Sequence, residues 1–127
     1  MAHNGQMQGK RVLVTGAGTG IGRGVALEFA KEGGAVVLHY AHSDGGARSA
    51  VEEITNSGGK AAAFQADLAH IGQCQELAEQ ARGFLGGIDV LVNNAGITMN
   101  RPFMEVTPEQ YNKLYDVNIR GMFFVTQ

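Results

Sequence analysis

Apolar residues occur in this 127-residue chain as short continuous runs, separated by longer stretches of mixed polarity. Within each run the apolar residues are adjacent rather than alternating, which is typical of strands covered on both faces. The pattern therefore predicts four short buried β-strands, at residues 11–15, 35–40, 61–65 and 88–93.

The stretches between these runs carry apolar residues every three or four positions, as one face of an α-helix does. We predict helices over residues 20–32, 44–57 and 71–84. A pair of glycines follows each of them, and glycine just past the last turn is a common helix stop.

A fourth helix is predicted to begin at Thr107-Pro108-Glu109-Gln110. Thr107 and Gln110 have the spacing of a capping box, and proline is favoured at the first helical position. Asn118 falls in the middle of the apolar stripe of this helix. The faces expected to be buried are Ile21, Val25 and Phe29 in the first helix; Ala47, Ala50, Val51 and Ile54 in the second; Ile71, Cys74, Ala78, Ala81 and Leu85 in the third; and Tyr111, Leu114, Tyr115, Gly121, Met122 and Val125 in the fourth.

Strands that alternate with helices form a parallel sheet, because each crossover helix returns the chain to the same end of the sheet. We therefore predict an α/β fold with a doubly wound parallel sheet of the Rossmann type, in which ligands bind beyond the carboxyl ends of the strands. The last helix has no stop residue and the sheet has only four strands. We expect the sequence to be truncated, with residues 1–127 forming the N-terminal part of a single domain.

Composition and charge argue against several classes of function. The formal net charge of −2 gives no electrostatic basis for binding nucleic acid or an anionic membrane surface. The apolar runs are far shorter than a membrane span, and the polar first ten residues lack the apolar core of a secretory signal. Cys74, the single cysteine, fits a core position and a reducing, cytoplasmic setting. His3, His39 and His70 have no metal-like spacing, so no metal site is expected.

The most informative stretch joins the first strand to the first helix and has glycine at every second position, at Gly16, Gly18, Gly20 and Gly22. The N-terminus of a helix has unpaired N–H groups and a partial positive charge, and glycine lets a phosphate approach them closely. This predicts a nucleotide phosphate site in a dinucleotide-binding domain. The alternative for the glycines alone is a plain strand-to-helix connection.

Three motifs together resemble the classical short-chain dehydrogenase/reductase family: Thr15-Gly16 with Gly20-Ile21-Gly22, Asn93-Asn94-Ala95-Gly96, and Asp116-Val117-Asn118. They occur in the family's order, and the resemblance covers essentially the whole chain. The glycine spacing is similar to that of the classical branch, whereas the extended branch has Thr-Gly-x-x-Gly-x-x-Gly. The resemblance implies an oxidoreductase that transfers a hydride between a nicotinamide cofactor and a carbonyl or secondary alcohol. The chain looks most like 3-oxoacyl-carrier-protein reductases and glucose dehydrogenases.

The resemblance also implies which residues contact the cofactor. In the family an acid at the position of Asp67 bonds the adenine amino group, and the segment after the fourth strand lies along the ribose and nicotinamide. Asp67 has an alternative or additional role as an N-terminal cap of the third helix. Asn93 and Asp89 are expected to be structural. The residues carried over are Gly16, Gly18, Thr19, Gly20, Ile21, Gly22, His42, Asp67, Leu68, Asn94, Ala95 and Gly96.

The end of the second strand favours NADP(H) over NAD(H). Sites that prefer NAD usually have an acid there that bonds both ribose hydroxyls. Here the first acid is Asp44, already at the start of the second helix, while His42 and Ser43 offer donors to a 2′-phosphate. NAD(H) is the alternative, and an ordinary exposed loop histidine is the alternative interpretation of His42.

Asn118 matches the asparagine of the family's catalytic tetrad, and a satisfied core asparagine is the alternative. The family's serine and Tyr-x-x-x-Lys pair come later in relatives, and no Tyr-x-x-x-Lys occurs here. We therefore expect this chain alone to be inactive and the complete protein, a homotetramer or homodimer, to act on a small carbonyl or alcohol. The rival hypothesis is a nucleotide-binding fragment that serves as a regulatory or interaction module.

Overall fold

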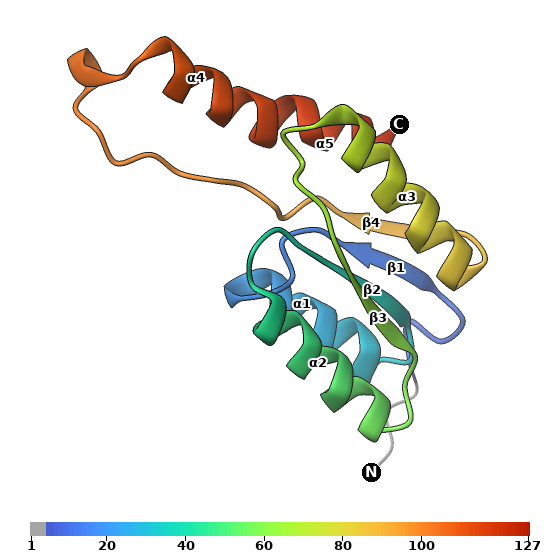
Figure 1. The fold of residues 1–127 in the computed structure, drawn as a ribbon. Helices are drawn as coiled ribbons and strands as arrows, with labels where there is room; N and C mark the ends of the chain where they lie inside the picture. Colours follow the sequence, from blue (N-terminus) through green and yellow to red (C-terminus); the bar gives the residue numbers. More distant parts are fainter. Residues whose placement is uncertain (1–4) are drawn as a thin grey trace.

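The computed structural model describes residues 5–127, in which a parallel sheet lies between two layers of helices (Figure 1). His3, considered above as a metal ligand, lies outside the described residues. The elements in chain order are β1 (Arg11–Val14), α1 (Gly20–Lys31), β2 (Ala35–Tyr40), α2 (Asp44–Asn56), β3 (Ala61–Gln65), α3 (Ile71–Leu85), β4 (Val90–Val92), the 3₁₀ turn η1 (Phe103–Glu105), α4 (Pro108–Tyr115), the π-helical segment η2 (Asp116–Gly121) and α5 (Met122–Thr126).

The predicted α/β fold is confirmed, and the strand order in the sheet is β3-β2-β1-β4 with every pairing parallel. The largest difference from the predicted strand limits is at the fourth strand. We predicted residues 88–93, but only Val90–Val92 pair with β1, opposite Val12–Val14.

Successive strand residues face opposite layers of the sandwich, as the pleat of a strand requires. Val12 and Val36 pack with Ala26 of α1 and Ala50 of α2 in one core. On the other face, Leu13 and Val37 pack in a second core with α3 residues and with Val125 of α5. Figure 1 shows the same division, with α1 and α2 on one side of the sheet and α3, α4 and α5 on the other.

The predicted faces of the first and third helices need small corrections. Ile21 is 79% exposed, because α1 packs on the sheet through the small residues Gly22 and Ala26 instead. In α3 the predicted positions Cys74, Ala81 and Leu85 are buried, and Leu77, which the prediction omitted, is buried with them.

The predicted stripe on the fourth helix is wrong as a single face. Tyr111, Tyr115 and Met122 are exposed, whereas Gly121 and Val125 are buried. Tyr111 and Tyr115 lie on α4, which has no buried residue, whereas Gly121 in η2 and Val125 in α5 lie where the helix packs against the rest of the fold.

One of the two predicted helix caps is confirmed and the other is wrong. Thr107 caps α4 as predicted: its hydroxyl accepts from the Gln110 amide at 3.2 Å, and the Gln110 side chain accepts from the Thr107 amide at 3.0 Å. Asp67 is not the N-cap of α3, because the helix begins later, with His70 at that position. The Asp67 carboxylate instead accepts from the amide of Ala69 at 3.0 Å, within the turn that precedes the helix.

Candidate functional site

A cleft of about 530 Å³ opens where β1, β2, β3 and β4 end, with α4 and η2 on its far side. All of the predicted cofactor residues except Gly22 line it, and Asn118 does not. The predicted residues that the structure brings together there are Gly16, Gly18, Thr19, Gly20, Ile21, His42, Asp67, Leu68, Asn94, Ala95 and Gly96.

The glycine turn is held in place by the exit of β4. Gly16 has a φ of +64°, in the left-handed region that favours glycine, and a Cβ there would lie 2.8 Å from the Cα of Ala95. The Thr15 hydroxyl accepts from the amides of Asn94 and Ala95 at 3.1 and 3.0 Å and donates to the Val92 carbonyl at 3.3 Å. The turn and the Asn94–Gly96 segment are therefore one connected wall of the cleft.

Gly22 contributes to this wall by packing rather than by facing the cleft. A Cβ on Gly22 would overlap the carbonyl oxygen of Gly16 and the side-chain nitrogen of Asn94. Those two atoms are themselves hydrogen-bonded at 3.0 Å. Position 22 must therefore be a glycine so that α1 can begin directly against the turn.

The N-terminus of α1 is open toward the cleft. Within residues 5–127 no side chain caps its first turn, and that turn carries no acidic residue. Gly20 has a φ of +55°, and a Cβ built on it would meet no atom within 4 Å. Exposed backbone N–H groups and a positive helix end in a concave site fit a phosphate group.

His39 is a site residue that the sequence analysis did not single out. The residue is 1% exposed and lines the cleft. Nδ1 accepts from the amide of Gly16 at 3.0 Å, and Nε2 lies 2.8 Å from the carbonyl oxygen of Ala66, to which it donates. Burial lowers the pKa of His39 below its ordinary value, and the bond to Ala66 opposes part of that shift. The only hint in the sequence is a lone polar residue within an apolar strand.

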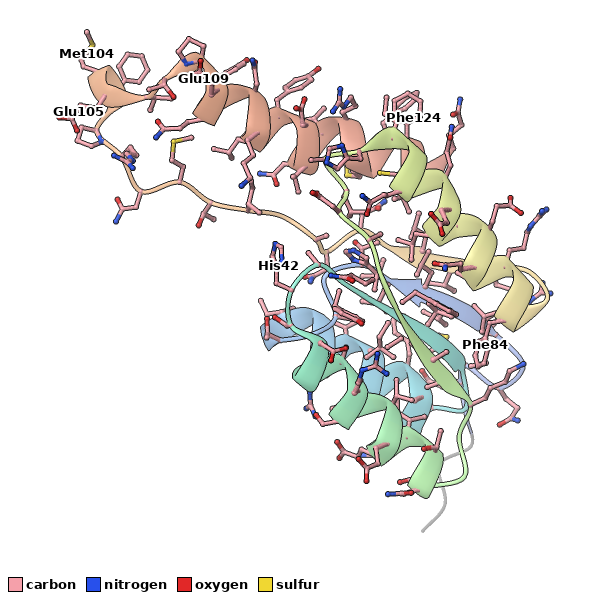
Figure 2. All side chains as sticks on the ribbon, viewed as in Figure 1. His42, Phe84, Met104, Glu105, Glu109 and Phe124 are labelled. Atoms are coloured by element: carbon pink, nitrogen blue, oxygen red, sulfur yellow. The ribbon has the colours of Figure 1, made fainter. Side chains whose placement is uncertain are left out.

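The end of β2 presents donors to the cleft, not an acid. His42 and Ser43 line it, and Figure 2 shows His42 on the loop after β2, pointing toward the segment that leads to α4. Asp44 does not line it, because its carboxylate turns to the Tyr40 hydroxyl and to Arg48, whose Nε lies 2.6 Å away. These two hydrogen bonds, Tyr40 first, lower the pKa of Asp44.

The opposite wall contains two further residues that the sequence analysis missed, Lys113 and Val117. They lie one turn apart on α4 and η2, so a helical spacing of four could have identified them together. Lys113 is the only lysine or arginine among the residues lining the cleft, and no ion pair to it is found within the described chain. Asp67 is the only acid in the lining.

The expected structural residues have partners outside the cleft. Asp89 bridges the entry of β1 by accepting from the Arg11 amide and side chain, each at 2.9 Å. The Arg11 guanidinium lowers the pKa of Asp89 to about 2. Asn93 donates to the Thr126 hydroxyl at 3.2 Å.

Within residues 5–127, no group of three or more His, Cys, Asp or Glu side chains is placed to hold a metal ion. The same part of the chain contains no helix that is long and apolar enough to cross a membrane.

Burial raises the pKa of the Cys74 thiol, and that thiol donates to the Leu68 carbonyl at 3.4 Å.

The family model described as short chain dehydrogenase matches residues 10–127. The chain belongs to the short-chain dehydrogenase family. An uncharacterized oxidoreductase of Methylorubrum extorquens is 46% identical over 122 residues, which are 96% of this chain and 49% of that protein. The hydroxynaphthalene reductase-like protein Arp2 of Metarhizium acridum is 39% identical over 121 residues, 95% of this chain and 45% of that protein.

Solved structures of short-chain dehydrogenases share the fold. A short chain dehydrogenase from Burkholderia cenocepacia J2315 in complex with NADP has a TM-score of 0.93 and 34% sequence identity, over 96% of this chain and 50% of its own. The chain thus spans about half the length of the short-chain dehydrogenases that it matches.

Proposed function

We propose that this chain forms the NADP(H)-binding part of an oxidoreductase that transfers a hydride between NADP(H) and a carbonyl or secondary alcohol. The observation that carries the proposal is the cleft itself, where the open end of α1 and the donor-bearing end of β2 meet at the carboxyl edge of a parallel sheet. The similar Burkholderia cenocepacia dehydrogenase, which is in complex with NADP, supports the choice of cofactor.

In this proposal each wall of the cleft holds a different part of the cofactor. The glycine turn and the first turn of α1 take the diphosphate through backbone N–H groups. The Asp67 carboxylate, a pure acceptor, suits the adenine amino group, and Asn94–Gly96 offers small residues against the ribose and nicotinamide. When bound, the nicotinamide supplies or accepts the hydride.

The preference for NADP(H) rests on the end of β2. His42 and Ser43 donate into the cleft there, and Lys113 adds a positive charge from the opposite wall. Asp44, the acid that would favour an unphosphorylated ribose, is engaged with Tyr40 and Arg48. A 2′-phosphate therefore meets donors rather than a carboxylate.

Reduction of a carbonyl is the direction suggested by the reductase-like relative from Metarhizium acridum. A 3-oxoacyl thioester is one substrate class within that chemistry. The proposal assigns Asn118 to the family's catalytic tetrad, and it includes a cytoplasmic homodimer or homotetramer for the complete protein. Each of these assignments is implied by the family resemblance.

The test is a fluorescence titration of NADPH and NADH on the longest protein that the gene encodes. We expect NADPH to bind at least about tenfold more tightly, since a well-placed charge-assisted contact is worth about 1.5–3 kcal/mol. The variant His42→Glu, which places a carboxylate beside the 2′-phosphate, should reverse the preference, whereas Gln80→Glu, at an exposed position of α3 outside the cleft, should leave it unchanged. Tighter binding of NADH to the unmodified protein would overturn the proposal.

The alternative proposal is a nucleotide-binding fragment that serves as a regulatory or interaction module, without the family's Tyr-x-x-x-Lys pair. A chain with the cofactor cleft but without that pair would bind the nucleotide and not turn over a substrate. Measuring NADPH oxidation with a panel of ketones separates the two functions. Nucleotide binding without turnover in the longest gene product supports the binding module, and turnover excludes it.

A further inference from the structure

We propose that His39, in its neutral form with the proton on Nε2, is the positioning residue that holds the glycine turn in its binding geometry. The ring joins the ends of three strands: it lies on β2, accepts from the turn after β1, and donates to the residue after β3. The inference rests on the proposed function, because the turn is taken to hold the cofactor.

Gly16 is the residue through which His39 acts. It lines the cleft, and both of its backbone polar groups are bonded to side chains: the amide to His39 Nδ1 and the carbonyl to Asn94 Nδ2, each at 3.0 Å. The left-handed backbone at Gly16 is therefore fixed from both sides. Removing either bond leaves a backbone group of Gly16 without its partner and loosens the start of the turn, although the Ala17 amide still donates to the His39 carbonyl at 2.7 Å.

The two bonds of His39 require a single protonation state. A neutral imidazole has one donor and one acceptor nitrogen, whereas a protonated imidazole has two donors. Because Nε2 faces a carbonyl, it carries the proton, and Nδ1 is left as the acceptor for Gly16. Protonation would set two N–H groups against each other at the Gly16 bond and release the turn.

The surroundings favour the neutral form. The pKa of His39 is lowered by burial, and only the bond to Ala66 acts in the other direction. The charged side chains of Arg23 in α1 and Glu53 in α2 lie on the opposite face of the sheet from His39. They form an ion pair with each other, with 3.9 Å between the Arg23 nitrogen and the Glu53 oxygen. Neighbouring elements carry further titratable groups on the His39 side of the sheet: Asp67 after β3, His70 before α3, Cys74 on α3, Lys113 on α4 and Arg120 on η2. The end of β2 adds Tyr40, which also lines the cleft, and Asp44, which does not.

The direction of the pH effect follows from the depressed pKa. Above the ordinary histidine pKa of about 6.5 the ring is neutral in both the bound and the free protein, and the turn is held. As the pH falls toward and below the lowered pKa, the fraction of protein with a released turn grows. Affinity for a nucleotide should therefore fall with acid.

The experiment measures the binding of ADP-ribose, which has no 2′-phosphate of its own to titrate, by calorimetry between about pH 8 and pH 5. We expect the affinity of the unmodified protein to fall as the pH is lowered through this range, most steeply at its acid end, because the pKa of His39 is depressed. His39→Asn keeps an acceptor near the Nδ1 position without a titrating ring, so its affinity should stay within about threefold of the unmodified protein at pH 8 and should not fall with acid. His42→Asn removes the other histidine of the cleft and should retain the fall.

A ligand-free readout separates this inference from the proposed function. Nitrogen NMR of the imidazole should show the neutral Nε2–H form at neutral pH, and the amide signal of Gly16 should move with pH in the unmodified protein but not in His39→Asn. An Nδ1–H ring, or the same acid dependence in His39→Asn as in the unmodified protein, would overturn the inference. Failure of ADP-ribose to bind at any pH would count against the proposed function, while the two NMR signals would still decide the role of His39.

Discussion

The side-chain amide of Asn118 pairs with both backbone polar groups of Ile97: Oδ1 accepts from the Ile97 amide at 2.8 Å, and Nδ2 donates to the Ile97 carbonyl at 2.9 Å. The pair ties η2 to the segment that follows β4. Ile97 lines the cleft and Asn118 does not, so the asparagine acts on the cleft through Ile97. A catalytic role for Asn118 stays a prediction.

Replacing Asn118 with leucine should destabilise the fold by about 1–3 kcal/mol, because two partly buried backbone groups of Ile97 lose their partners. Asn118→Asp keeps the acceptor for the Ile97 amide but sets a carboxylate oxygen against the Ile97 carbonyl, so it should also lose stability. Urea unfolding of the three proteins measures the differences. Equal stability of Asn118→Leu and the unmodified protein would show that the pair does not contribute.

Gly22 and Gly24, two residues apart on α1, should respond in opposite directions to substitution by alanine. A Cβ on Gly22 would overlap Gly16 and Asn94, and overpacking typically costs about 1–3 kcal/mol. A Cβ on Gly24 would meet no atom within 4 Å, so the higher helix propensity of alanine should add about 0.5–1 kcal/mol. Thermal unfolding compares the two variants. A loss at Gly24, or none at Gly22, would contradict the packing described.

Lys113→Met should weaken the binding of NADPH, because Lys113 is the cation that lines the proposed cofactor cleft. Lys31→Met, at the end of α1 and outside this cleft, makes the same change in net charge and serves as the control. We expect a loss of about three- to tenfold for Lys113→Met, shrinking at high salt as a screened charge interaction does. If both variants lost the same affinity for NADPH, Lys113 would act only through the net charge of the protein and not through its place in the cleft.

Asp89→Asn should lower the free energy of unfolding at neutral pH and matter little near pH 2. The pKa of Asp89 is depressed to about 2 by Arg11, so the pair stabilises the fold above the ordinary aspartate pKa. That contribution is lost as the pH falls through the depressed value. Urea unfolding at several pH values should show the gap between the two proteins closing in acid. If the difference in the free energy of unfolding persisted at pH 2, the substitution would act through packing and not through the charge of Asp89.

The fold and most of the cleft were predictable because short-range patterns encode them. Adjacent apolar residues marked the strands, glycine pairs marked the helix ends, and Thr107 with Gln110 marked a helix start. Parallel topology then brought the strand ends to one edge, so Gly16, Asp67 and Asn94 were expected to meet, and they all line the cleft.

The residues that the sequence analysis missed depend on long-range geometry. His39 and Lys113 become informative only once the Gly16 turn and α4 are placed around them. The exposure of Ile21 was missed because helical periodicity records spacing but not which residues, here Gly22 and Ala26, are small enough to permit close packing.

The π-helical segment Asp116–Gly121 makes one part of the fourth helix tolerant of a change in residue count. A π-type turn holds about one residue more than an α-helical turn, so deleting one residue from this segment would convert the wide turn to an ordinary one and leave the residues beyond it on their present face. Val125 would then keep its place against α3, whereas a deletion within α4 would rotate the residues beyond it by about 100°. Alignments that place a one-residue gap in this segment would therefore identify family members in which an ordinary helix packs on the sheet with the same face.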